Sequence, residues 1–300
     1  MSNKEPVKAG FLVIRNSFQF QIRYFLTIFT KLFCMYKLLI LLFFAVVVTS
    51  CGSENTVAPP VVTSTYSKVL TVDSANTRIE LYNENSSILL VGYNEIGFKV
   101  FVDNIEKKTG FFKYMPVMFH TSGPGHSTPV QSDFYYDNTK GMFTGYVCYS
   151  MLSDSTSFWF ADYNYNNEFS VKRRQFDVVL GTGNQMRIWF DAGANMLYYL
   201  TLISPKDPVV GLNDFKVILH KSADQVNYDE VSNAQMYIKP WMPAHGHGSS
   251  SNVNPAFSSY GRYEGKVNFT MPGQWFVYDS IVVNNQTISS PSLYLVFDAR

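Results

Sequence analysis

Apolar and polar residues alternate in short runs through most of this 300-residue chain. In residues 262–269 the apolar side chains occupy every second position, so they share one face of an extended strand. Residues 274–279 and 293–297 show the same alternation. Turn-forming pairs such as Asn-Asn, Pro-Gly and Gly-Asn separate the runs, and beyond residue 51 no long stretch has the period of an amphipathic helix. The pattern predicts an all-β chain.

The same patterns occur twice, about 120 residues apart. Residues 141–151 match residues 261–271 in phase, and other ordered matches accompany them. A period of this length is too long for one unit of a solenoid, so each copy is expected to be a domain. Several short strands in each copy are typical of an immunoglobulin-like β-sandwich. We therefore predict two tandem immunoglobulin-like β-sandwich domains after an N-terminal signal segment, at residues 65–170 and 171–300.

The first 50 residues have the features of an export signal. An uninterrupted apolar run, residues 38–48, follows Lys37 and ends in Thr-Ser-Cys. The run fits the hydrophobic region of a signal peptide and is shorter than the roughly 20 residues that span a bilayer as a helix. Met35 is the expected start of translation, which makes residues 1–34 a mis-assigned extension.

Small residues that lead into a cysteine resemble the lipobox of bacterial lipoproteins. By that resemblance Cys51 becomes the first mature residue and carries the lipid. Residues 51–64 contain two adjacent prolines and small polar residues, so we expect a linker that holds the first domain away from the membrane. The chain is therefore expected to be a lipoprotein, anchored to the outer membrane or the periplasmic face of a bacterial cell envelope.

Charge and motifs argue against two classes of function. Of the 24 basic and 23 acidic side chains, six and one lie in residues 1–50, which leaves 18 and 22. A mildly acidic chain has no basic surface for nucleic acid. The sequence also lacks a Gly-x-Ser-x-Gly elbow, a phosphate-binding glycine loop and a His-Glu-x-x-His motif, so we do not expect an enzyme. The one cysteine beyond residue 51, Cys148, is predicted to be a buried thiol.

Four of the five histidines lie in two segments rich in Met, His and Gly, residues 240–248 and 116–126. In the later segment His245 and His247 are two apart, so in extended backbone both imidazoles point the same way. Met242 adds a thioether a few residues upstream. The later segment is therefore a candidate metal-binding loop.

The donor types favour copper, because sulfur selects Cu(I) and imidazole nitrogen suits Cu(II) or zinc. No Asp or Glu lies within residues 236–254, so the segment lacks the carboxylate oxygens that calcium and magnesium prefer as ligands. Met271, at the end of a following strand, is expected to supply a further sulfur. The earlier segment offers Met118, His120 and His126 at looser spacing. The alternative is a rigid loop whose imidazoles bond backbone carbonyls and whose methionines fill the core.

The Met-Pro-Ala-His-Gly-His sequence of the later segment, with the Gly-Arg-Tyr-Glu-Gly strand after it, resembles the YtkA-like domain family, which is related to the FixH proteins. The resemblance is best in residues 205–283 and weaker in residues 90–160. It implies a small exported or membrane-anchored β-sandwich domain associated with copper handling and oxidase assembly. The family's loop falls on Met242, His245 and His247, and the first copy shares it only in part.

We therefore expect a protein that captures a copper ion at its Met/His loops and hands it to a copper-receiving protein. The rival interpretation is a non-enzymatic immunoglobulin-like module that binds a glycan or a protein partner through exposed aromatic side chains. It rests on Tyr135-Tyr136 and on residues 158–165, because adjacent residues of a strand point to opposite faces. Donor atoms that converge would favour the metal, and an open aromatic strip would favour the rival.

Overall fold

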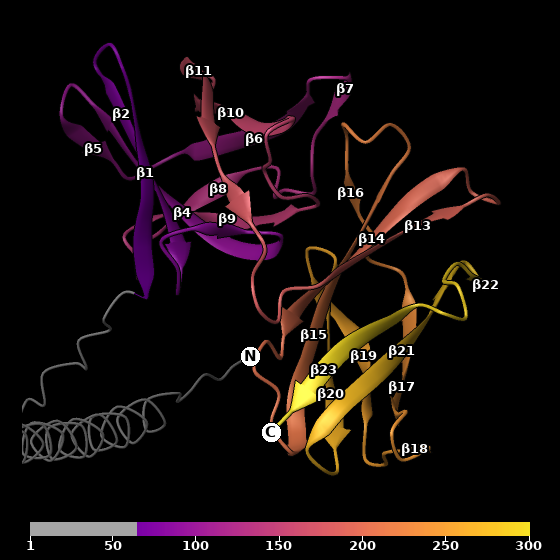
Figure 1. Cartoon of the computed structure of the whole chain (residues 1–300). Helices are drawn as coiled ribbons and strands as arrows, with labels where there is room; N and C mark the ends of the chain where they lie inside the picture. The colour runs from indigo at the N-terminus through magenta and orange to yellow at the C-terminus, as the bar shows by residue number, and fades with distance from the viewer. Residues whose placement is uncertain (1–64) are drawn as a thin grey trace, which may run out of the picture. The chain divides into compact units, whose positions relative to one another are not determined.

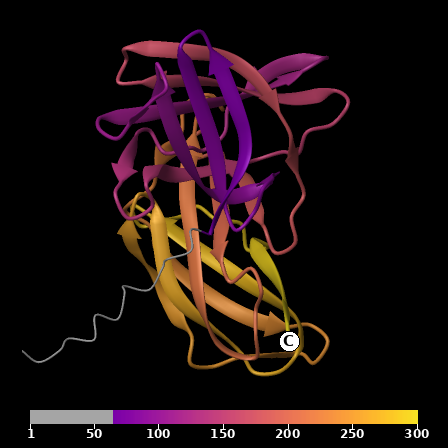
Figure 2. The same cartoon turned by 90° about the vertical axis from the view of Figure 1, so that its left-hand side faces the viewer.

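The computed structural model describes residues 65–300, which fold into strands, turns and loops. The coloured part of the chain has the same all-strand character in both views (Figure 1, Figure 2). Residues 63–300 form one compact unit. In the described part of the chain, no helix has the length and apolar character needed to cross a membrane. The expected signal segment, linker and lipidated Cys51 lie outside the described residues.

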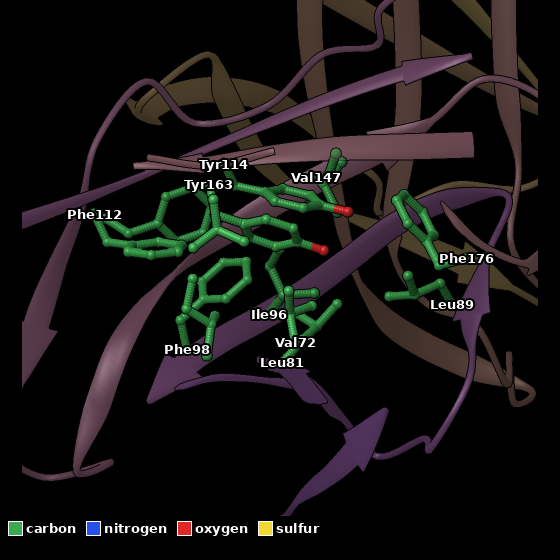
Figure 3. Close-up of a cluster of buried hydrophobic side chains, with 14 of the residues drawn as sticks. Val72, Leu81, Leu89, Ile96, Phe98, Phe112, Tyr114, Val147, Tyr163 and Phe176 are labelled. Carbon is green, nitrogen blue, oxygen red and sulfur yellow. The ribbon is translucent and has the colours of Figure 1, made fainter. Parts of the chain in front are cut away.

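Strands β1 to β12 form the first sandwich. In chain order they are β1 (Tyr66–Ser74), β2 (Thr77–Glu84), β3 (Leu89–Leu90), β4 (Gly92–Val102), β5 (Ile105–Lys107), β6 (Phe111–His120), β7 (Gly123–His126), β8 (Phe134–Asp137), β9 (Met142–Tyr149), β10 (Ser157–Tyr165), β11 (Phe169–Phe176) and β12 (Val178–Val179). One sheet runs in the order β1-β2-β4-β9-β8-β6-β10-β11, with β5 on β4 and β7 on β6, while β12 pairs with β3. Phe98 on β4 packs against Phe112 and Tyr114 on β6, with ring centroids 4.5 and 5.2 Å apart. The part of the sheet around β4 and the part around β6 therefore enclose a common core (Figure 3).

Strict alternation along β10 fills that core. Trp159, Ala161 and Tyr163 are buried, whereas the residues between them, such as Phe158 and Phe160, are half-buried on the other face. Side chains on an extended strand point alternately to its two faces, so every second ring enters the core. The aromatic run at residues 158–165 is thus mainly a core strand rather than an open strip.

Strands β13 to β23 form the second sandwich. In chain order they are β13 (Met186–Asp191), β14 (Met196–Ser204), β15 (Gly211–Ser222), β16 (Asp229–Glu230), β17 (Gln235–Met242), β18 (His247–Gly248), β19 (Val253–Ser259), β20 (Arg262–Phe269), β21 (Gly273–Val283), β22 (Gln286–Thr287) and β23 (Tyr294–Ala299). One layer has the order β13-β14-β15-β20-β19 and the other the order β18-β17-β21-β22, with β23 on β21. The rings of Phe269 on β20 and Trp275 on β21 have centroids 5.7 Å apart, so the two layers pack against each other and form a second core. The prediction of an all-β chain is confirmed.

A bend at the start of β4 recurs at the start of β15 in the other sandwich. The Asn94 side chain donates to the carbonyl oxygens of Leu90 and Gly92, at 2.6 and 3.0 Å, and accepts from the Leu90 amide. The Asn213 side chain makes the corresponding three bonds, to Val209 and Gly211. Gly92 and Gly211 have φ of +88° and +103°, a conformation that glycine adopts without strain. The same local chemistry therefore starts β4 and β15.

The change from one sandwich to the other falls later than the expected division near Ser170. Strand β11 pairs with β10, and β12 pairs with β3, so both belong with the first sandwich. The first strand of the second sandwich begins at Met186. The division at residue 170 was predicted from sequence matches, which carried no information on how residues 169–179 pair.

A small cluster with a buried centre and an exposed carboxylate joins the two sandwiches. The Tyr146 hydroxyl donates to Glu230 at 2.7 Å and lies 2.9 Å from Nε2 of His220. The Arg262 guanidinium lies over the Tyr146 ring, 4.7 Å from its centroid. Cys148 is buried in the same cluster, and burial raises the pKa of its thiol to about 12, so the thiol stays protonated. We call Tyr146, His220, Glu230, Arg262 and Cys148 the junction.

Candidate functional site

The Met/His segment of the second sandwich forms the tight end of a hairpin. Met242 ends β17 and pairs directly with His247, which begins β18. The amides of His245 and Gly246 both donate to the Met242 carbonyl oxygen, at 3.2 and 2.9 Å, and Gly246 has φ +66°. His245 therefore lies on a turn while His247 begins a strand, so the two imidazoles do not share one extended segment. The turn nevertheless holds the two imidazole rings with centroids 6.0 Å apart.

His247 is oriented by its surroundings. Its ring meets the buried Trp275 ring edge to face, with centroids 5.6 Å apart. Its Nδ1 lies 3.0 Å from the Gly248 carbonyl oxygen. A carbonyl can only accept, so Nδ1 carries the proton and Nε2 keeps a lone pair for a metal. His245, by contrast, is exposed on the turn.

Two methionines lie close to this hairpin. Met242 is 2% exposed and belongs to the second core, where its methyl carbon lies against Gly273. Residues directly opposite each other on antiparallel strands project to the same face, so Met242 and His247 share one side of the hairpin. The carbonyl oxygen of Met271 accepts the indole N–H of Trp275 at 3.0 Å, and its half-buried side chain packs on the same core. We call Met242, His245 and His247 the second centre, and Met271 packs on the core behind it.

The first sandwich carries the same arrangement. Met118 near the end of β6 pairs directly with His126 on β7. The His126 ring meets the buried Trp159 ring edge to face at 5.7 Å, and the Trp159 indole N–H donates to the Met151 carbonyl oxygen at 2.9 Å. The rings of His120 and His126 have centroids 5.3 Å apart. The sequence placed these residues in one segment but did not reveal that His126 takes the place of His247. We call Met118, His120 and His126 the first centre.

The imidazoles of the first centre are more enclosed and more firmly held. Nδ1 of His126 lies 2.7 Å from the Ser127 carbonyl oxygen, while Nε2 is shielded from solvent and has no hydrogen-bond partner. Burial lowers the pKa of His126, and the nearby His120 lowers it further, against the opposing effect of the Ser127 bond. Nδ1 of His120 is hydrogen-bonded to the Ser157 hydroxyl at 3.0 Å. A neutral imidazole with an unpartnered nitrogen is what metal ligation requires.

The donor types at both centres fit a copper ion better than zinc, while the ring separations fit either metal. Imidazole nitrogen binds such metals at about 2.0–2.1 Å, so two rings that share an ion have centroids roughly 5–6.5 Å apart. In residues 65–300 no group of three or more His, Cys, Asp or Glu side chains could hold a metal ion. Each centre thus offers two imidazoles, and its remaining protein donor is a methionine sulfur. Structural zinc takes four nitrogen, thiolate or carboxylate ligands, whereas a thioether selects Cu(I).

Sequence reasoning missed the junction. His220 is 1% exposed, although a residue beside Lys221 near the end of an apolar run is expected to be a polar strand end. Burial, with a further contribution from the Arg262 charge, lowers the pKa of His220 to about 3, so the ring is neutral. Its partner Tyr146 carried no signal in the sequence beyond a place in a β-like run. The contact between the two depends on how one sandwich covers the other.

Comparison with known proteins places one family in this chain. Residues 197–278 match the YtkA-like family, and the match lies within the second sandwich. No curated protein sequence matches the chain.

Solved structures that resemble the chain share little sequence with it. The Escherichia coli adhesin FdeC is 14% identical and has a TM-score of 0.26; the match covers 77% of this chain and 66% of that one. Invasin, a bacterial integrin-binding protein, is 8% identical with a TM-score of 0.25, and the match covers 75% of this chain and 39% of that one. The D0-D1 domain of intimin is 11% identical with a TM-score of 0.20, and the match covers 71% and 91% of the two chains. The chain thus spans less than two thirds of the first two structures.

Proposed function

From the YtkA-like domain that residues 197–278 form, we propose that this chain is a lipid-anchored protein of the cell envelope that binds copper and hands it to a receiving protein. One observation carries the proposal most directly. At each hairpin end a buried methionine stands opposite a histidine whose Nδ1 bonds a carbonyl, with a second imidazole at 5.3 or 6.0 Å. This arrangement presents soft sulfur and imidazole nitrogen donors together.

The chemistry is capture and ligand exchange rather than catalysis. Cu(I) is the favoured cargo, because the nearest sulfur donors are thioethers. Met242 and His247 belong to the rigid part of the hairpin, whereas His245 projects from the turn into solvent. An exposed ligand can be displaced by a donor of a receiving protein while the other two still hold the ion. Trp275 orients His247 from behind, in the way that surrounding groups commonly orient metal ligands.

The binding proposal is tested by titrating residues 63–300 with Cu(I) under anaerobic reducing conditions and with Zn(II) in parallel. We expect Cu(I) to bind more tightly, and His245→Ala/His247→Ala to remove one equivalent of bound copper. Lys239→Ala, on the same strand but outside the donor set, is the matched control and should leave the titration unchanged. Undiminished copper binding by the double variant would show that the second centre is not the site.

The anchoring proposal is tested by replacing Cys51 with alanine in the full chain. We expect the variant to lose incorporation of a labelled fatty acid and to leave the membrane fraction, because a lipid chain supplies membrane affinity in proportion to its buried CH₂ groups. Persistent labelling of the Cys51→Ala protein would refute the anchor without affecting the copper proposal.

A second candidate function, binding of a glycan or protein partner, is supported by one outer face. Met115 and Phe119 on β6 are 41% and 36% exposed, and the Phe119 ring meets Phe160 of β10 edge to face at 5.4 Å. This candidate predicts binding to members of a glycan panel that Phe119→Ala/Phe160→Ala abolishes while copper binding persists. Tyr135, at 61% exposed, is the exposed member of the other aromatic pair, whereas Tyr136 is half-buried.

A further inference from the structure

The two Met/His centres share a plan but differ in how their imidazoles are held. In the first centre His120 is bonded through Nδ1 to the side chain of Ser157, a residue of the neighbouring strand β10. His126 has a solvent-shielded Nε2, and Met118 is fully buried. All three donors of the first centre therefore lie on or beside paired strands and need little reorganisation to bind an ion.

The second centre holds one of its imidazoles loosely. His245 lies on the four-residue turn between β17 and β18, is exposed, and is followed by Gly246 in a left-handed conformation. The two rings are also further apart, at 6.0 Å against 5.3 Å in the first centre. Closing this centre on an ion requires the turn to order, and an incoming ligand can reach His245 from solvent.

These differences act on the rate at which copper leaves. A preorganised site avoids the free-energy cost of ordering its ligands, and differences in affinity between related sites appear mostly in the dissociation rate. Copper transfer between proteins proceeds by stepwise exchange of ligands, so a donor that solvent can reach is replaced first. A shielded imidazole slows that step.

We propose that the first centre is a second Cu(I) site that retains its ion, while the second centre exchanges its ion rapidly with partners. The proposal rests on the proposed copper function and adds a site outside the residues of the YtkA-like match. The chain then carries one stored and one transferable copper ion. No change in the oxidation state of the metal is involved, and each transfer replaces protein donors with donors of the acceptor.

The test is a stopped-flow measurement on residues 63–300 loaded with two equivalents of Cu(I) without oxygen. The protein is mixed with excess of an aromatic diimine chelator that absorbs when it binds Cu(I). We expect two phases of equal amplitude whose rates differ by about tenfold or more. His245→Ala should remove the fast phase and His126→Gln the slow phase, each with loss of about one equivalent of copper.

Two further variants change the first centre without removing an imidazole, so their effect on the release rate does not depend on a loss of folding. Ser157→Ala deletes the bond to His120 and a hydrogen bond to the exposed Asp154 side chain but removes no donor atom of the centre, so two equivalents should still bind while the slow phase accelerates several-fold. Met118→Leu keeps the buried volume and should also accelerate the slow phase, with an unchanged near-ultraviolet circular dichroism spectrum as the check on folding.

The outcomes distinguish a failure of this proposal from a failure of the proposed copper function. If the protein binds no Cu(I), both fail. If it binds one equivalent that His245→Ala removes and His126→Gln does not, the copper function stands and the first centre is not a site. Two equivalents released in one phase, or a slow phase that Ser157→Ala leaves unchanged, would overturn the division between storage and exchange.

Discussion

The strand pairs β4–β9 and β15–β20 are built alike but meet different surroundings. Each begins at a positive-φ glycine that an asparagine side chain secures. Beyond that glycine, Tyr93 on β4 is 5% exposed, whereas Leu212 on β15 is 56% exposed. On the partner strands Tyr146 is fully buried and Lys266 is exposed. The outer face of the β4–β9 pair is therefore buried because the second sandwich covers it.

The Met/His hairpins behave differently from the strand pairs. Met118 faces His126 and Met242 faces His247, with a buried tryptophan behind each histidine. The plan of the hairpin is therefore kept in both sandwiches even though their outer faces differ. Local strand pairing determines the hairpins, while the arrangement of the sandwiches determines the junction.

The largest expected effect comes from breaking the junction. Tyr146→Ala removes a fully buried ring and leaves His220 and Glu230 without their hydroxyl partner. We expect the free energy of unfolding to fall by about 3–5 kcal/mol, as for other buried aromatic truncations. Lys266→Ala, on the strand pair that is not covered, should change it by no more than about 0.5 kcal/mol. Urea unfolding of both variants checks the contrast, and equal losses would contradict the role of the junction.

The pH dependence of the free energy of unfolding tests the burial of His220 in the junction. The pKa of His220 is lowered from 6.5 to about 3 in the folded protein, so between these values the unfolded chain binds more protons. The contribution of His220 to the free energy of unfolding is complete above about pH 6.5. Below that pH it falls by about 1.4 kcal/mol per pH unit.

At pH 5 we expect the wild type to have lost about 2 kcal/mol through His220 relative to pH 7. His220→Gln, which retains a side-chain hydrogen-bonding group toward Tyr146, should flatten this part of the profile. Urea midpoints measured at pH 7 and pH 5 decide the matter. A variant whose midpoint shifts as much as that of the wild type would show that other groups cause the acid sensitivity.

The smallest effect is expected at the two asparagine-secured bends. Asn94→Ala leaves backbone groups of Leu90 and buried Gly92 without partners, which costs about 2 kcal/mol. Asn213→Ala should cost about 1 kcal/mol, because Val209 is 52% exposed and water can replace the lost bonds. Chemical unfolding of the two variants measures the difference. A larger loss for Asn213→Ala would reverse the comparison.

The alternation of apolar residues was sufficient to predict the strands that build each core. In β20, for example, Tyr263, Val267 and Phe269 are buried as their spacing predicts. The period of two is a local property of extended backbone, so it can be read without knowing the rest of the fold. The YtkA-like resemblance, carried by the loop and the following strand, is confirmed by the family match.

The sequence identified the residues of both centres but not their partners. It compared His245 and His247 as positions of one extended segment, whereas His245 lies on a turn with Gly246 at positive φ and His247 begins β18. It also did not show that His126, six residues beyond His120, pairs with Met118. Pairing depends on where a chain reverses, and a loop of Gly, Pro and Ser allows several reversals. The recurring tryptophans 159 and 275 were the available signal.

The sequence alone determined the β character, the core-facing positions and the soft donors of the two hairpins, because each follows from residue type and spacing along one strand. Only the tertiary structure decided that Tyr146 and His220 meet in a buried contact, and that the two imidazole rings of each hairpin lie 5.3 or 6.0 Å apart. Those contacts join residues far apart in the chain, so they depend on strand pairing and on how one sandwich covers the other.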